Sequence, residues 1–306
     1  MTTAAADCDP TQFVTHFANP RDFQQAYVHE GVGGLPVVLV HGWPETKRIF
    51  WRVIKPLASN GCEVIVPDLR GFGDSAIGPG PYGDVPTHAR DVYALAHDHL
   101  GHQQVTLVGG DLGGPVIQEL ALRYPEWVTS MVLFNSPLPY LKEAMGGMNS
   151  RPPREAADYY LRQGTDADAL VLELSTPAQR RRYVETFYGS RFWAHPGSFT
   201  AEAAAFHAEP FGDGDKLRAS VRAYESSFCA DARSEPGVLG RNGITPTTIL
   251  FGTSDHVLYP EFDLMAATVF ARHHGPFLLR NCGHFVPWES PGPLVDAVLM
   301  TVALHR

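Results

Sequence analysis

The chain has 306 residues, of which 44% are hydrophobic and 19% charged, and it carries a formal net charge of −9 at pH 7. This is the composition of an ordinary globular protein, long enough for one large α/β domain or for one domain with an insertion. A pI of about 5.8 argues against nucleic-acid binding, because nucleic acids attract basic surfaces.

No apolar run approaches the ~18–20 residues of a membrane-spanning helix, so we expect no membrane association. The first residues, MTTAAADCDPTQF, lack a basic region followed by an apolar stretch, so we expect no signal peptide. Cys8, Cys62, Cys229 and Cys282 lie far apart without metal-ligand spacing, which predicts reduced thiols in a cytoplasmic protein. We expect no metal and no cofactor. The sequence leaves the oligomeric state open, with a homodimer as one option.

Short apolar runs rich in Val, Ile and Leu predict the strands of a sheet. They lie at residues 36–40, 63–67, 105–109, 130–134, 247–251 and 276–280. Their apolar character is continuous rather than alternating, which is typical of parallel strands buried on both faces.

Helical patterns separate these runs. In THARDVYALAHDHLG, Thr87 is the expected N-cap, Val92, Ala96 and Leu100 share one face, and Gly101 suits the helix end. Strands that alternate with helices predict an α/β fold with a doubly wound sheet.

The alternation stops over residues 136–231, where only helical patterns occur: REAADYYLRQ, TPAQRRRYVETFY, SFTAEAAAFHAE and GDKLRASVRAYESSF. This predicts a helical cap (136–231) inserted between two parts of the α/β core (1–135 and 232–306). Because open α/β sheets bind ligands beyond the carboxyl ends of their strands, we expect the cap to cover such a site.

The stretch GGDLG, residues 109–113, follows a predicted strand and precedes a helix. It has the form of a nucleophile elbow, a sharp turn in which glycines flank the nucleophile because strand and helix approach closely. Asp111 stands where serine is common. The alternative is an ordinary helix N-cap aspartate.

Two further polar residues follow late strands, Asp255 in LFGTSDHV and His284 in RNCGHFVPWESP. The order nucleophile, acid, histidine, each beyond a strand end, is typical of a catalytic triad. The loop HGWP (His41–Pro44) follows an earlier strand and can direct a backbone N–H toward the reacting group.

With these motifs the chain resembles the α/β-hydrolase superfamily and, within it, the epoxide hydrolases with an aspartate nucleophile. The resemblance rests on HGWP, DLRGFGDS, GGDLGG, the cap-sized insertion and the late Asp255 and His284, and it spans nearly the whole chain. It implies a mostly parallel sheet with a helical cap, and the opening of a small epoxide to a vicinal diol. Some relatives place the acid after the strand that here ends before Asn135, which makes Asp255 the better choice.

The resemblance also implies the roles in catalysis. A carboxylate that attacks a saturated carbon forms an alkyl ester, so Asp111 would be the nucleophile. His284 would activate the water that cleaves the ester, and Asp255 would orient His284. The backbone N–H groups of Trp43 and Leu112 would form the oxyanion hole.

Cap tyrosines supply the proton for the opened epoxide in this family. Tyr224, in SVRAYESSF, matches the second of them, and Tyr160, in DYYLRQ, is chosen as the first. Tyr159 stays open as the alternative, because adjacent helical residues point about 100° apart. The usual Phe-Gln signature is reduced here to residues 161–163, Leu-Arg-Gln. The expected substrate-pocket residues are Trp43, Tyr159, Trp193 and Phe285.

Haloalkane and haloacid dehalogenases use the same aspartate and are the main alternative. Haloalkane dehalogenases generally carry a tryptophan directly after the nucleophile, where this chain has Leu112. Fluoroacetate dehalogenases carry arginines just beyond, where this chain has residues 113–115, Gly-Gly-Pro. A non-catalytic relative is disfavoured because Asp111, Asp255 and His284 are all retained.

Overall fold

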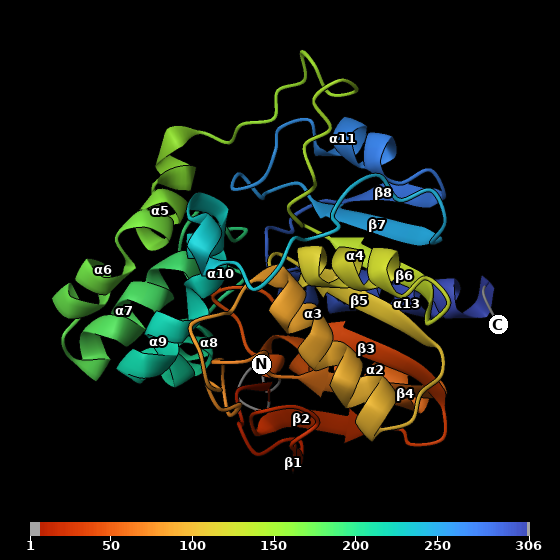
Figure 1. The fold of residues 1–306 in the computed structure, drawn as a ribbon, viewed down its shortest axis with the longest axis horizontal. Helices are drawn as coiled ribbons and strands as arrows, with labels where there is room; N and C mark the ends of the chain where they lie inside the picture. The colour runs from red at the N-terminus through yellow and green to blue at the C-terminus, as the bar shows by residue number, and fades with distance from the viewer. Residues whose placement is uncertain (1–6, 305–306) are drawn as a thin grey trace.

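The computed structural model describes residues 7–304, and within them eight strands form one sheet (Figure 1). The spatial order is β1-β2-β4-β3-β5-β6-β7-β8. The strands are β1 (Thr15–Ala18), β2 (Gln25–Glu30), β3 (Leu35–Val40), β4 (Cys62–Pro67), β5 (Val105–Gly110), β6 (Val128–Phe134), β7 (Thr247–Gly252) and β8 (His273–Leu279). β1 pairs antiparallel with β2, and β2 pairs antiparallel with β4. The remaining neighbours, from β4 to β8 in the spatial order, pair parallel.

All six strands expected from the sequence are present, and β3, β4 and β5 are buried as expected. The burial expected for residues 276–280 was wrong. β8 is the edge strand, and its Phe277 and Leu278 are 46% and 60% exposed. β1 and β2 were missed, because neither contains a continuous apolar run.

Helices cover both faces of the sheet, so the doubly wound arrangement is confirmed. α3 and α4 pack together on one face, and α2 and α13 on the other (Figure 1). None of the helices described here is long and apolar enough to cross a membrane. The core helices are η1 (Lys47–Phe50), α2 (Trp51–Ser59), α3 (Val85–Tyr93), the π-helical η2 (Ala94–His99), α4 (Gly113–Arg123), α11 (Phe262–Val269), α12 (Val286–Glu289) and α13 (Pro291–Leu304).

The start of α3 corrects the sequence prediction. The N-cap is Asp84, not Thr87, and the Asp84 carboxylate accepts a hydrogen bond from Thr87 N at 3.3 Å. An acid three residues earlier is an equally good cap, and proline follows it in the first turn. The helix continues into η2 and ends before Gly101, whose φ of 82° matches the predicted stop.

The segment between β6 and β7 carries the expected helices, which lie together beside the core (Figure 1). They are α5 (Arg154–Thr165), α6 (Ala167–Glu173), α7 (Pro177–Tyr188), α8 (Ala201–Ala208), η3 (Glu209–Gly212), α9 (Gly214–Ser220), α10 (Arg222–Phe228) and η4 (Ala230–Ala232). α6 was not predicted, and the run 214–228 forms two helices that break at Val221. We call this segment the cap. Its boundaries at residues 136 and 231 stay a prediction.

Candidate active site

Asp111 lies in a sharp turn between β5 and α4. Its φ is 42°, in the left-handed region that few non-glycine residues adopt. The neighbouring glycines make the turn possible, since a Cβ at Gly113 would lie 2.1 Å from Val40 O and one at Gly110 would lie 2.2 Å from the Phe134 ring. Asp111 is not the N-cap of α4, because the cap position is Leu112 and no side chain caps the helix. The local geometry is therefore that of an elbow.

Two groups contact the Asp111 carboxylate, and a third extends the chain of contacts. Trp43 N donates to Oδ1 at 2.6 Å, and His284 Nε2 lies 3.1 Å from Oδ2. His284 Nδ1 in turn lies 2.7 Å from Asp255 Oδ2. Asp111, Asp255 and His284 are 7%, 6% and 1% exposed. The structure thus brings together the nucleophile, histidine and acid that the sequence predicts.

The HGWP loop reaches Asp111 because Gly42 has no side chain. A Cβ at Gly42 would lie 2.4 Å from the Asp111 Cβ. Gly42 N donates to the Glu45 carboxylate at 2.6 Å, which fixes the loop in this position. Burial, with a further contribution from the Asp111 charge, raises the pKa of Glu45 to about 8. A protonated Glu45 adds no second negative charge beside the nucleophile.

Asp255 is held by donors that sequence reasoning did not identify. Its Oδ1 accepts from Val257 N at 2.7 Å and from Leu258 N at 3.2 Å. Its Oδ2 accepts from Asn135 Nδ2 at 2.7 Å, and Asn135 Oδ1 accepts from Gly252 N at 2.8 Å. Asn135 therefore anchors the acid rather than replacing it. Its position at the end of β6, beside β7, was the available signal.

Glu289 is a second residue that the sequence did not reveal. Its carboxylate accepts from Gly283 N at 2.9 Å, from Phe285 N at 3.0 Å and from His195 N at 2.8 Å. These bonds fix the loop on both sides of His284 and tie it to the cap. The WESP sequence gave no indication of this role, because all three donors are backbone groups.

The charges around His284 favour its protonated form. Burial alone would lower the pKa of this imidazole, but the carboxylates of Asp255 and Asp111 raise it well above its ordinary value. The imidazole can therefore hold a proton as long as both carboxylates are charged. Loss of either charge would lower the pKa of His284 and favour the neutral imidazole, the form that can accept a proton.

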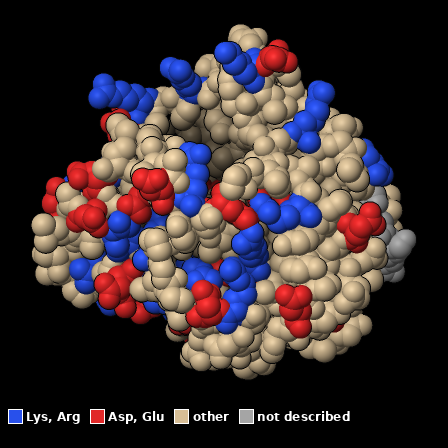
Figure 2. All heavy atoms as spheres, viewed as in Figure 1, with Lys and Arg blue, Asp and Glu red and all other residues tan. Residues whose placement is uncertain are grey.

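A cavity of about 500 Å³ opens beside Asp111, between the core and the cap. Asp111, Leu112 and the cap tyrosines Tyr159, Tyr160 and Tyr224 line it. The remaining lining is Val85, Pro115, Pro137, Leu138, Pro152, Ala157, Ala223, Ser227, Leu239, Val257, Leu258 and Tyr259. Figure 2 shows the surface hollowed between cap and core. The lining is mainly apolar, which suits an apolar small molecule.

Three of the lining tyrosines, Tyr159, Tyr160 and Tyr224, come from the cap. The Tyr159 ring stacks on Trp43, with centroids 5.9 Å apart and planes at 8°, and Tyr224 meets Trp43 edge-on at 5.7 Å. Burial, and then the charge of Asp111, raise the pKa of both phenols well above 10. Tyr160 is 37% exposed, and its ring contacts Tyr224 and Phe228, each at 5.3 Å between centroids, rather than Trp43. The geometry therefore favours Tyr159 over Tyr160 as the partner of Tyr224.

Of the expected pocket residues, only Tyr159 belongs to the cavity lining. Trp43 and Phe285 are fully buried, and Trp193 is 3% exposed. Trp193 lies behind Tyr159 at 4.9 Å and packs edge-on against His284 at 4.6 Å, measured between ring centroids. These three rings support the triad and the tyrosines from behind. Leu112, by contrast, lines the cavity directly after Asp111.

The fold and the site together define an enzyme of the α/β-hydrolase class: a mostly parallel sheet, a nucleophile elbow after β5, and an acid and a histidine after β7 and β8. Residues 36–291 match the family described as alpha/beta hydrolase fold, and the chain belongs to that family.

The relatives carry several activities, among them epoxide hydrolysis and haloalkane dehalogenation. The chain is 28% identical over 300 residues to a soluble epoxide hydrolase from Corynebacterium sp. (strain C12), covering 97% of this chain and 99% of the relative. It is 26% identical over 277 residues to haloalkane dehalogenase 2 from Mycobacterium tuberculosis, covering 89% of each. The solved structure of the epoxide hydrolase CorEH without ligand superposes with a TM-score of 0.82 at 26% identity, covering 96% and 100% of the two chains.

The proximity of Asp111 and His284 predicts a linked titration. In Asp111→Asn, we expect the pKa of His284 to fall below its wild-type value, because one of the two neighbouring negative charges is removed. NMR titration of the imidazole C–H resonances measures it. Asn in place of the exposed Asp296 of α13 is the control and should leave the pKa unchanged. An unchanged His284 pKa in Asp111→Asn would contradict the electrostatic account.

Proposed function

We propose that this enzyme is an epoxide hydrolase, which opens an epoxide to a vicinal diol through a covalent alkyl ester on Asp111. The observation that carries the proposal is the arrangement of two phenols, Tyr159 and Tyr224, around the cavity that contains the Asp111 carboxylate. Opening an epoxide needs both a nucleophile and a proton donor for the ring oxygen. Similarity to the Corynebacterium epoxide hydrolase supports the same reaction.

In the first step, Asp111 Oδ2 attacks one epoxide carbon. Oδ1 is held by Trp43 N–H, so Oδ2 is the oxygen that can leave its contact with His284 and reach the substrate. The new C–Oδ2 bond forms as the C–O bond of the ring breaks. The ring oxygen takes a proton from Tyr159 or Tyr224, which becomes a tyrosinate.

In the second step, a water molecule gives a proton to His284 Nε2 and attacks the carboxyl carbon of Asp111. The oxyanion forms on Oδ1, where Trp43 N–H already donates and Leu112 N–H is the proposed second donor. The bond between the carboxyl carbon and Oδ2 then breaks, and the departing diol oxygen takes the proton from His284. The acid proton left on Asp111 returns to the tyrosinate, which restores the enzyme.

The charge of Asp111 coordinates these steps. While the carboxylate is free, it keeps the phenols of Tyr159 and Tyr224 neutral by raising their pKa values. As the ester forms, the negative charge moves to the substrate oxygen, and the phenols become stronger acids when a proton is needed. His284 loses a countercharge at the same time, so its pKa falls and the imidazole gives up its proton to solvent, which leaves it neutral and able to accept the proton of the water in the second step.

Dehalogenation is the alternative that the haloalkane dehalogenase relative supports. That reaction needs donors for a leaving halide. Leu112 offers no side-chain donor at the position after the nucleophile, and the indole N–H of Trp43 is engaged by Ser220 Oγ at 3.1 Å. A neutral phenol suits an alkoxide, which keeps the proton it receives. Epoxide opening is therefore favoured.

A cytoplasmic location and a homodimer stay predictions.

A substrate panel tests the proposed function. Purified protein is incubated with aryl and alkyl epoxides and, separately, with bromoalkanes and haloacetates, and diol and free halide are quantified. We expect diol from the epoxides and no halide above the level of Asp111→Ala, the control for background reaction. Halide release that exceeds diol formation would identify a dehalogenase instead.

Single tyrosine variants test the choice of proton donors. We expect Tyr159→Phe and Tyr224→Phe to slow epoxide turnover strongly, since loss of a general acid costs about 10²–10⁴-fold where nothing replaces it, and the remaining tyrosine softens the loss. Tyr160→Phe is the matched control and should stay within a few-fold of wild type. Rates of diol formation and thermal melts are measured together. A larger loss in Tyr160→Phe than in Tyr159→Phe would return the role to Tyr160.

A further inference from the structure

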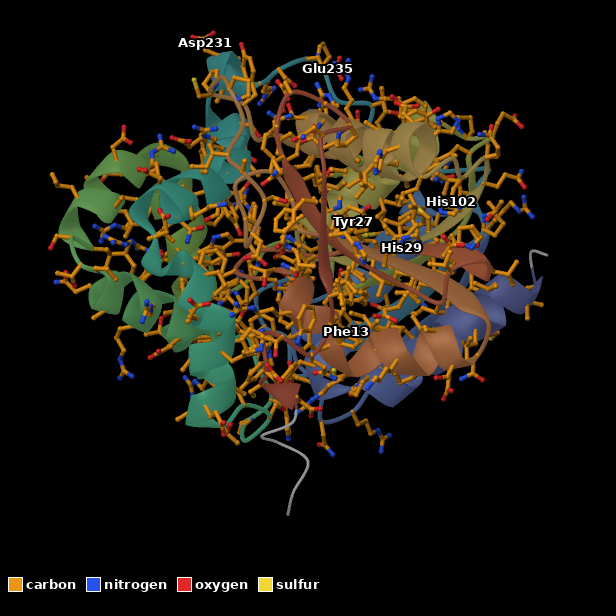
Figure 3. All side chains as sticks on the ribbon, turned by 90° about the horizontal axis from the view of Figure 1, so that it is seen from below. Phe13, Tyr27, His29, His102, Asp231 and Glu235 are labelled. Atoms are coloured by element: carbon orange, nitrogen blue, oxygen red, sulfur yellow. The ribbon has the colours of Figure 1, made fainter. Side chains whose placement is uncertain are left out.

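Three side chains with metal-binding atoms meet far from Asp111. They are His29 at the end of β2, Glu63 at the start of β4 and His102 between η2 and β5. His29 Nε2 lies 2.7 Å and His102 Nε2 3.2 Å from the same oxygen, Glu63 Oε1. The ligand atoms of the three residues all lie within 4.8 Å of one another. Figure 3 labels His29 and His102, which lie close together beside the sheet.

The strand register assembles this cluster. β2 and β4 pair antiparallel with His29 opposite Ile65. Glu63 is two residues before Ile65, so alternation along the strand places Glu63 and His29 on the same face of the sheet. The segment after η2 brings His102 over that face. β4 and β5 run in the same direction in the sheet, because both pair parallel with β3. Glu63 lies at the start of β4, whereas Asp111 follows the end of β5. The cluster and Asp111 therefore lie beyond opposite ends of the parallel strands.

The cluster is preorganised and largely shielded from water. The side chains of His29, Glu63 and His102 are only 15%, 7% and 14% exposed. Gly33 N donates to Glu63 Oε2 at 2.9 Å, which orients the carboxylate so that Oε1 faces both imidazoles. His102 Nε2 is buried and, despite its 3.2 Å approach to Oε1, makes no hydrogen bond of normal geometry.

His29 Nε2 hydrogen-bonds Glu63 Oε1 at 2.7 Å, a contact that would lengthen around a shared cation, whereas the position of His102 already fits one. Ligand atoms on a tetrahedral ion, each at ~2.05 Å, lie about 3.3 Å apart, close to the separation of His102 Nε2 and Glu63 Oε1. Two imidazoles and one carboxylate select zinc-like d-block ions, since Mg²⁺ and Ca²⁺ prefer oxygen ligands alone. A cation between the three atoms would also use the His102 nitrogen that otherwise has no hydrogen bond.

We propose that His29, Glu63 and His102 form a binding site for a divalent d-block cation of the zinc class, with water completing the tetrahedron. The ion would join β2, β4 and the segment before β5, and so fasten the antiparallel edge of the sheet. This role is independent of the proposed function, because the site lies away from Asp111. From the sequence we expected no metal, and residues 29, 63 and 102, which lie far apart along the chain, were not considered as ligands.

Metal binding to untagged, chelator-treated and desalted protein tests the proposal. We expect Zn²⁺ to bind with one-to-one stoichiometry by calorimetry, Co²⁺ to give the visible absorption of a tetrahedral site, and Mg²⁺ and Ca²⁺ to give neither. Zn²⁺ should also raise the melting temperature, because it binds the folded state. No saturable Zn²⁺ binding by the wild-type protein would overturn the proposal.

Variants locate the ion. His102→Gln should weaken Zn²⁺ binding at least about 100-fold and abolish the Co²⁺ spectrum, while its melting temperature in chelator stays at the wild-type value. His29→Gln, which can still donate a hydrogen bond to Glu63, is a second variant with the same expected loss. His274→Ala, at an exposed position on β8 at the other edge of the sheet, is the matched control. Wild-type affinity in His102→Gln, or equal losses in His274→Ala, would place the ion elsewhere and overturn the assignment.

Discussion

The Asp111 carboxylate is held between a backbone N–H on one oxygen and an imidazole on the other, at the tip of a turn with a φ of 42°. This arrangement requires a close approach of three segments. The end of β3 lies against the start of α4, where a Cβ at Gly113 would clash with Val40 O. The HGWP loop lies against the nucleophile, where a Cβ at Gly42 would clash with the Asp111 Cβ. The parallel sheet brings the other site residues to the same place. Its strands β3, β5, β7 and β8 have their carboxyl ends on one side of the sheet, where Trp43, Asp111, Asp255 and His284 meet.

One negative charge links the parts of the site. The Asp111 carboxylate contributes to the raised pKa values of Tyr159, Tyr224 and His284, although these groups come from the cap and from the end of the core. In the proposed reaction that charge passes to the substrate oxygen and later returns. In that reaction the pKa values of the two phenols and of His284 would change in turn as Asp111 is esterified and released. The cap is needed for this, because it carries both phenols and excludes water from them.

The sequence predicted features that depend on local pattern and missed those that depend on contacts between segments. Buried parallel strands are continuously apolar, and a nucleophile elbow needs glycines at fixed spacing, so both could be found. Asn135 acts by contacting the side chain of Asp255, and Glu289 acts by accepting from backbone N–H groups, so neither role follows from a sequence motif. The choice between Tyr159 and Tyr160 depends on the rotation of α5 against Trp43, which only the packed structure gives. The expected N-cap at Thr87 failed because Asp84 competes for the same role.

The central claim is that an oxygen of Asp111 becomes an oxygen of the product. A single turnover in heavy-oxygen water, with enzyme in excess over epoxide, tests it directly by mass spectrometry of the diol and of the peptide that contains Asp111. If Oδ2 bonds to the substrate and water attacks the carboxyl carbon, the first diol is unlabelled and the label appears in the peptide. If Asp111 only activates a water as a base, the diol carries the solvent oxygen and the peptide stays unlabelled, and that result would contradict the account.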